Sequence, residues 1–273
     1  MTITDDIHLR EKIDLLTQSI SRKGNILVAF SGGVDSSVVA AAVERALGDR
    51  ALAVIIGSPL HPSSELEEAR RTAEHIGINS LVVQLNELEI PGFCGNPPSR
   101  CYLCQSFRIR KLKEIAIERH FETVADGTNA SDLNEYRPGL KAKEELGMYC
   151  PLVEAGLSKD ATRNIAELLG LPIANKAASP CLATRFPYDH ELTPERLMRI
   201  ETAESWIRDV TGVKILRVRE LDRSARIEVG PEERELFFNG SLLDEVARKL
   251  KGLGYDFVTL DVEGYKSGSF DRG

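Results

Sequence analysis

The stretch Ser31-Gly32-Gly33-Val34-Asp35-Ser36-Ser37 combines two glycines, three hydroxyls and a carboxylate. It follows the apolar residues 26–30 and precedes small and apolar residues, 38–47, that favour a helix. A strand that runs into a Gly-Gly turn and then a helix directs backbone N–H groups toward one point, where glycines let an anion approach closely. We therefore predict a phosphate site made by Ser31, Gly32, Gly33, Asp35, Ser36 and Ser37.

The spacing of this loop excludes two common nucleotide-binding motifs. No Gly-Lys-Ser/Thr follows the glycines at P-loop NTPase spacing, and the segment is not Gly-x-Gly-x-x-Gly. The competing interpretation is a Gly-Gly turn that only caps a helix. The strand-turn-helix setting, together with the glycines, hydroxyls and carboxylate of the loop, favours phosphate binding over that interpretation.

The five cysteines are too sparse for a disulfide scaffold in 273 residues, and they indicate metal binding or catalysis in a reducing compartment. Cys101-x-x-Cys104 has the spacing of metal or iron–sulfur ligands but lacks the second pair of a structural zinc site. Cys181, in a proline-rich loop, is the candidate third thiolate, which would leave one metal position open. Alternatively, Cys101 and Cys104 are buried as small apolar residues. We expect Cys94 and Cys150 to be structural.

Cys181 is also a candidate nucleophile. Arg185 lies four residues later, and a cationic neighbour makes a thiolate more available. We predict Cys181, Arg185 and Asp35 as catalytic residues.

Two arginines alternate with apolar residues near the C-terminal end of the chain. Arg217 and Arg219 would share one face of a strand, and Glu228 lies on the strand that follows. Paired guanidinium groups bind phosphate or carboxylate through several donors, so these three residues are candidate substrate ligands. Alternatively, they form a solvated sheet face. Arg108, Arg110, Lys111 and Lys113 are expected on the solvated face of their helix.

Strands and helices alternate along the first part of the chain. Apolar runs predict strands at 26–30, 51–56, 80–85 and 122–126, with helices between them. This order is typical of an α/β, doubly wound parallel sheet, whose ligands bind beyond the carboxyl ends of the strands. Gly127, Thr128 and Asn129 follow the last of these strands, so we expect them to meet the Ser31 loop and to contribute to the same site.

The pattern changes after a proline-rich stretch. We predict a first domain over 1–170, a cysteine-bearing linker loop over 171–192, and a small α+β domain for substrate binding or oligomerisation over 193–273. Thr193-Pro194 is a strong helix start, with Thr as N-cap and Pro in the first helical position.

The charge and the distribution of apolar residues indicate which kinds of partner and location to expect. The formal net charge is −7, from 35 basic and 42 acidic residues, which disfavours a protein whose main partner is nucleic acid. No run of about 18 apolar residues predicts a membrane span, and the N-terminus lacks the apolar core of a signal peptide. These features predict a cytoplasmic protein.

The loop motif resembles the pyrophosphatase loop (PP-loop) of N-type ATP pyrophosphatases, and the chain as a whole resembles the LarE family of ATP-dependent sulfur transferases. The segments that carry the resemblance are Ser31 to Ser36, Cys101 to Cys104, Asp126 to Asn129, Ser179 to Arg185, Arg217 to Arg219, and the tail Gly264-Tyr265-Lys266-Ser267-Gly268-Ser269. The resemblance implies an adenine nucleotide alpha hydrolase-like fold, ATP and Mg²⁺ as cofactors, a small nucleotide substrate, and a homo-oligomer, in that family a hexamer.

By the same resemblance, the protein adenylates a carboxylate of pyridinium-3,5-biscarboxylic acid mononucleotide and delivers sulfur to form a thiocarboxylate, in the biosynthesis of the nickel-pincer nucleotide cofactor. Sacrificial members take the sulfur from the cysteine that matches Cys181. Because Cys101 and Cys104 are also present, the chain is similar to a three-cysteine sub-group, which implies a 4Fe-4S cluster on Cys101, Cys104 and Cys181. Lys266 departs from the arginine expected in the tail.

Three alternatives stay open. The first is sacrificial transfer of the Cys181 sulfur. The second is another PP-loop enzyme that forms an amide or thiolates tRNA. The third is a non-catalytic module that binds adenine nucleotides and holds a structural metal.

Overall fold

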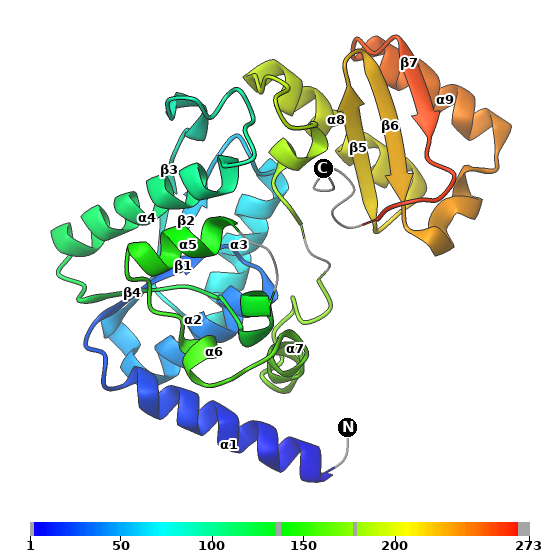
Figure 1. Cartoon of the computed structure of the whole chain (residues 1–273). Coiled ribbons are helices and arrows are strands. Elements are labelled where there is room, and N and C mark those ends of the chain that lie inside the picture. Colours follow the sequence, from blue (N-terminus) through cyan, green and yellow to red (C-terminus); the bar gives the residue numbers. More distant parts are fainter. Residues whose placement is uncertain (1–2, 135–137, 177–178, 267–273) are drawn as a thin grey trace. The chain divides into compact units, whose positions relative to one another are not determined.

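The computed structural model describes residues 3–134, 138–176 and 179–266. The chain forms two compact units (Figure 1). The first comprises Met1–Glu87 and Ser99–Ala178, and the second comprises Leu88–Pro98 and Ser179–Gly273. None of the helices in the described residues combines the length and the apolar character that a membrane span requires.

The first unit contains a four-stranded sheet in which every pair is parallel. Its strands are β1 (Ile26–Phe30), β2 (Ala51–Gly57), β3 (Ser80–Gln84) and β4 (Thr123–Ala125). They lie in the order β3-β2-β1-β4. The chain therefore moves outward from β1 through β2 to β3 and then returns to the other side of β1. The boundary between β1 and β4 is the topological switch point, where sheets of this kind bind ligands.

Helices cover both faces of this sheet, as the doubly wound prediction requires. They are α1 (Ile3–Ile20), α2 (Val34–Leu47), α3 (Ser63–Ile76), α4 (Arg100–Glu118), α5 (Pro138–Glu145), α6 (Pro151–Glu154) and α7 (Lys159–Leu168), with short 3-10 turns η1 (Gly48–Arg50), η2 (Glu87–Glu89) and η3 (Ala130–Asn134).

Side chains of β1 alternate between two hydrophobic cores. Ile26, Val28 and Phe30 pack in one core with residues of α1, α2, α3 and α7. Leu27 points to the other core, where it packs with Leu112 of α4. Because both faces are mostly buried at β1 and β2, these two strands are apolar apart from Gly57, which is why the sequence identifies them clearly.

The second unit is a small α+β unit with a mixed three-stranded sheet. Its elements are η4 (Leu182–Arg185), α8 (Pro194–Thr211), β5 (Leu216–Leu221), β6 (Ser224–Val229), η5 (Pro231–Phe237), α9 (Gly240–Gly252) and β7 (Phe257–Leu260). β6 lies between β5, to which it is antiparallel, and β7, to which it is parallel. The Thr193 side chain caps α8 by accepting from Arg196 N, which confirms the predicted helix start.

The second unit also includes residues 88–98, which precede α4 in the chain. Asn96 donates from its amide to the carbonyl oxygen of Pro187 at 2.7 Å, and Leu192 N donates to Cys94 O at 2.7 Å. Phe93 is buried. Backbone and side-chain bonds thus tie this segment to residues 187–192.

Candidate active site

The loop after β1 requires glycine at Gly32. This residue has φ +70°, and a Cβ there would lie 2.7 Å from the Ala69 Cα of α3. Only glycine combines that backbone conformation with so close a contact. Gly33 then serves as the N-cap of α2, so the loop runs directly into the helix N-terminus, as the motif predicts.

The three serines of the loop have different surroundings. Ser36 Oγ lies 3.0 Å from Ser31 Oγ and donates to Gly33 O at 3.1 Å, so this hydroxyl stabilises the turn. Ser37 Oγ is buried, and no described residue forms a hydrogen bond with it. A buried hydroxyl of this kind calls for an explanation such as a ligand or water. The helix N-terminus together with this hydroxyl fits the phosphates of ATP.

The segment after β4 meets this loop, which confirms the predicted convergence. A Cβ on Gly127 would lie 2.6 Å from Ser36 N, so the two backbones are in direct contact. Asn129 Nδ2 donates to Asp35 Oδ1 at 3.2 Å. Residues that are 94 positions apart in the sequence therefore form one site at the switch point between β1 and β4.

Asp35 lies in a partly desolvated position. Burial raises the pKa of its carboxyl above the ordinary 3.8, the hydrogen bond from Asn129 opposes this shift, and the nearby Asp132 adds to it. An ionised Asp35 therefore gains stability from any cation that binds beside it. This property fits a ligand of Mg²⁺, which prefers oxygen donors.

Asp126 and Lys143 hold the segment after β4 in place. Asp126 accepts from Thr128 N and Thr128 Oγ1, each at 3.0 Å. Lys143 of α5 pairs with Asp126 and donates to Thr128 Oγ1 at 2.7 Å. Cys150 donates to Asp126 at 3.4 Å, and burial and the Asp126 carboxylate raise the pKa of its thiol to about 12. The Cys150 thiol therefore helps to hold the Asp126 carboxylate.

Cys101 and Cys104 lie on the first turn of α4, and both are half-buried. Two contacts hold the N-terminal part of α4. Gly139 of α5 packs against it, because a Cβ on Gly139 would lie 3.6 Å from Cys101 O. Arg108 shares the helix face of Cys101 and Cys104, and its Nε lies 2.6 Å from Oε1 of the fully buried Glu87. The interpretation of Arg108 as a solvated residue is therefore wrong, because its side chain pairs with this buried carboxylate.

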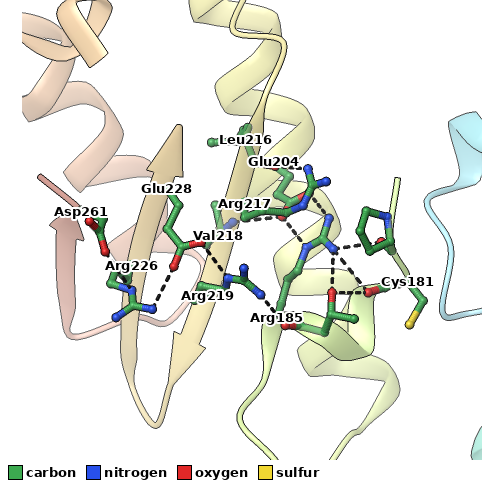
Figure 2. A network of polar contacts seen from close by, with 12 residues as sticks. Cys181, Arg185, Glu204, Leu216, Arg217, Val218, Arg219, Arg226, Glu228 and Asp261 are labelled. Carbon is green, nitrogen blue, oxygen red and sulfur yellow. Dashed lines mark hydrogen bonds and ion pairs between the residues drawn. The ribbon is translucent and has the colours of Figure 1, made fainter. Parts of the chain in front are cut away.

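Cys181 belongs to the second unit, where it precedes η4. Arg185 Nη1 donates to Pro180 O at 2.9 Å, to Cys181 O at 3.3 Å and to Thr184 Oγ1 at 3.0 Å. The sulfur of Cys181 points away from this guanidinium (Figure 2). Arg185 therefore contacts the backbone of the cysteine turn. No group of three or more His, Cys, Asp or Glu side chains in the described ranges is arranged to hold a metal ion.

Arg217, Arg219 and Glu228 lie on one sheet face, since Arg217 pairs with Glu228 and Arg219 with Arg226 in the register. The face is not solvated, because all three predicted ligands are at most 7% exposed. Arg219 pairs with Glu228 at 2.9 Å and donates to Thr184 O at 2.6 Å. Burial, and then the neighbouring Arg185, lower the pKa of Arg217.

Comparisons with known proteins agree with this arrangement. The NAD synthase family model matches residues 8–90, which include the whole Ser31 loop. The Synechocystis sp. protein slr1717 is 41% identical over 97% of this chain and 98% of its own length. The pyridinium-3,5-bisthiocarboxylic acid mononucleotide synthase of Lactiplantibacillus plantarum is 36% identical over 95% of this chain and 94% of its own.

This chain belongs to the LarE family. One subunit of the glutamine-hydrolysing GMP synthase of Methanococcus maripaludis is 32% identical over 69% of this chain and 64% of its own length. That partial match agrees with a PP-loop fold that several ATP-using families share.

The tail motif of this LarE-family chain is described only in part. Lys266 is exposed and donates to Glu263 at 2.7 Å, while Ser267, Gly268 and Ser269 lie outside the described residues. Tyr265 lies with its ring centroid 5.0 Å from Arg217 Cζ. The structure thus connects Tyr265, rather than Lys266, to the arginine face.

Sequence reasoning missed two charged residues, Lys143 and Glu204. Lys143 has no local signal, because its partners Asp126 and Thr128 lie on another element. Glu204 does have a local signal in the sequence. It interrupts the apolar face of α8, which is formed by the buried residues Leu197, Ile200 and Ile207. A single carboxylate on such a face predicts a buried ion pair.

Proposed function

We propose that this LarE-family protein is an ATP-dependent sulfur transferase. Its substrate is pyridinium-3,5-biscarboxylic acid mononucleotide, one carboxylate of which becomes a thiocarboxylate in nickel-pincer nucleotide cofactor biosynthesis. The observation that carries the proposal is the meeting of the Ser31 loop with Asn129 at Asp35. The relative from L. plantarum, named for the corresponding bisthiocarboxylic acid product, supports this choice of substrate.

Activation of the carboxylate belongs to the first unit. The backbone of Gly32, Gly33 and the start of α2, with Ser37, would bind the β- and γ-phosphates of ATP. Asp35 would bind Mg²⁺, and Asn129 would orient Asp35. The substrate carboxylate oxygen would form a bond to the α-phosphorus while the bond to the leaving pyrophosphate breaks, giving an acyl adenylate. Orientation of both reactants in one site would supply much of the rate.

Sulfur delivery depends on Cys101, Cys104 and Cys181. Thiolates at this spacing suit iron, and a 4Fe-4S cluster on these three residues would supply a transferable sulfide. The chain's own contribution is to hold Cys101 and Cys104 near the start of α4, a helix that the pair between Arg108 and Glu87 ties to the first unit. Sacrificial transfer of the Cys181 sulfur is the alternative for this step. In either case sulfur replaces AMP on the activated carboxylate.

Arg217, Arg219 and Glu228 would position the substrate's phosphate or second carboxylate. Arg217 is buried beside the guanidinium of Arg185, which lowers its pKa after the larger effect of burial. An anionic ligand near these two cations would relieve their repulsion. This effect favours an anion over a neutral group.

The deciding experiment measures pyrophosphate release. Protein purified without oxygen is incubated with ATP, Mg²⁺ and the dicarboxylate mononucleotide, and the product is examined by mass spectrometry. We expect release that depends on the dicarboxylate, together with a thiocarboxylate product. No dicarboxylate-dependent release would overturn the proposal.

Iron and sulfide assays on the same protein separate the two sulfur sources. We expect iron and acid-labile sulfide that Cys181→Ser abolishes and Cys94→Ser retains. Iron-free protein whose Cys181 loses the mass of H₂S during turnover would establish sacrifice instead. A homo-oligomer, a hexamer by family resemblance, is the expected state in solution, and sedimentation velocity measures it.

A further inference from the structure

Glu204 is a buried carboxylate with four donors around it. Its side chain is 1% exposed. Arg185 donates to it twice, from Nε at 2.8 Å and from Nη2 at 3.0 Å, and Arg208 Nη2 donates at 3.1 Å. The fourth donor is the backbone N–H of Val218, at 3.0 Å. Burial alone would raise the pKa of Glu204, but Arg185 and the other donors outweigh this effect and lower it.

These contacts join three elements of the second unit (Figure 2). Glu204 lies on α8. Through Arg185 it reaches the turn of residues 180–185, because the remaining nitrogen of Arg185 donates to Pro180 O and Cys181 O. Through Val218 it reaches β5 at the residue between Arg217 and Arg219. One carboxylate therefore contacts both the turn, by way of Arg185, and the strand directly.

We infer that Glu204 is a positioning residue that sets the Cys181 turn against the Arg217–Arg219 stretch of β5. The catalytic purpose of this alignment rests on the proposed function, in which Cys181 would carry sulfur and Arg217 and Arg219 would hold the substrate. The alignment itself rests only on the contacts. Glu204 accepts from Nε and Nη2 of Arg185, and Nη1 of the same guanidinium donates to the turn. Because Glu204 also accepts from Val218 N, these bonds fix the distance between the turn and β5.

Glu220 offers a matched control. Glu220 lies on β5, the strand that also holds Val218, and its side chain is 1% exposed. It accepts from Arg196 at 2.7 Å and from the Tyr255 hydroxyl at 2.9 Å. It is therefore also a buried, paired carboxylate of the second unit. None of its described contacts reaches residues 180–185. Substitution at Glu220 reports the general cost of losing such a pair.

The test is amide hydrogen exchange in the full-length protein without substrate. Thr184 N donates to Cys181 O at 3.0 Å, and Phe186 N donates to Ala183 O at 3.3 Å, so both amides report order in the turn. In Glu204→Gln the carboxamide presents donors to Arg185. We expect exchange at Thr184, Phe186 and Val218 to quicken about tenfold or more relative to Leu250 in α9, and Glu220→Gln to leave these ratios within about twofold.

Unchanged ratios in Glu204→Gln, or equal acceleration in Glu220→Gln, would overturn the inference. If Glu204→Gln does not fold, Glu204→Asp replaces it. The aspartate keeps the charge but is one methylene too short to reach both Arg185 and Val218, so exchange at the turn or at Val218 should still quicken. Normal exchange at all three amides in Glu204→Asp would equally contradict the inference.

Activity provides a second readout. In Glu204→Asp we expect a lower kcat for thiocarboxylate formation with an unchanged KM for ATP, since ATP would bind in the first unit. If the unaltered protein forms no thiocarboxylate, the proposed function fails, while the exchange comparison still decides whether Glu204 positions the turn.

Discussion

Asn129 Nδ2 donates to Asp35 Oδ1 at 3.2 Å, and this bond joins the segment after β4 to the first turn of α2. Asn129 itself is fixed, because its Oδ1 accepts from Ser131 N at 2.9 Å and its N–H donates to Asp132 at 3.1 Å. The carboxylate at the centre of the candidate site is thus oriented by a rigid neighbour.

Asp35→Asn should lower the activity without lowering the stability of the protein. The folded pKa of Asp35 is raised, chiefly by burial, so its ionisation opposes folding once the pH exceeds the ordinary value of 3.8. The neutral amide avoids this cost. At neutral pH we expect a melting temperature equal to or above that of the unaltered protein, with ATP-dependent pyrophosphate release reduced about 100-fold, the scale of one lost electrostatic contact in a site. Asp49→Asn, at an exposed residue, should change neither. A lower melting temperature in Asp35→Asn would contradict this account.

Gly127→Ala should disrupt the contact between the two halves of the candidate ATP site. The new Cβ would lie 2.6 Å from Ser36 N and 2.9 Å from Asp35 C, and both are backbone atoms that cannot rotate away. We expect a loss of about 1–3 kcal/mol in the free energy of unfolding and weaker ATP binding, measured by denaturant titration and calorimetry. Gly252→Ala is the control, since nothing lies within 4 Å of its Cβ position. Equal effects of the two substitutions would argue against the contact.

Arg108→Met should cost far more stability than Arg110→Met. Arg108 neutralises Glu87, which is completely buried, and also donates to Ser58 at 3.3 Å. Removal of one partner leaves a buried charge, so we expect a loss of about 3 kcal/mol. Arg110 is exposed, and its replacement should stay within about 0.5 kcal/mol. Urea unfolding of both variants provides the measurement, and similar losses would show that the Glu87 pair contributes nothing.

The contribution of Glu204 to stability should disappear in acid. Its folded pKa lies below the ordinary 4.5, because Arg185 and its other donors outweigh burial. A lowered folded pKa gives stability that is complete above the unfolded value and is lost as the pH falls through the folded one. The difference in free energy of unfolding between the unaltered protein and Glu204→Gln should therefore be constant above about pH 5 and shrink below pH 4.5. A difference that does not depend on pH would show that folding does not lower the pKa of Glu204.

Much of the fold follows from local pattern. The apolar runs of β1 and β2 identify buried strands, and their alternation with helices predicts the parallel sheet that the structure contains. The Ser31 loop is equally local, because Gly32 must adopt a positive φ within four residues of the strand. Alternation along β5 likewise places Arg217 and Arg219 on one face, as the register confirms.

The environment of the charged residues could not be predicted in this way. A helical pattern assigns Arg108 to a solvated face, but its partner Glu87 is 21 residues away in the chain. The face of Arg217 and Arg219 is buried, and Thr184, from the cysteine turn, accepts a hydrogen bond from Arg219. Residues 88–98 pack with residues 179–273 for the same reason: Asn96 finds its partner at Pro187.

Most strands and helices, the candidate phosphate-binding loop and the candidate cysteines can be identified from the sequence alone, because each depends on neighbours within a few residues. Which charges are buried, and which groups they hold, follows from the folded chain. Burial depends on elements brought together from distant parts of the chain, and a buried charge is stable only where such an element supplies its partner. Glu204 illustrates this difference. The helical pattern places its carboxylate on an apolar face of α8, whereas only the folded chain shows that it joins Arg185 to β5.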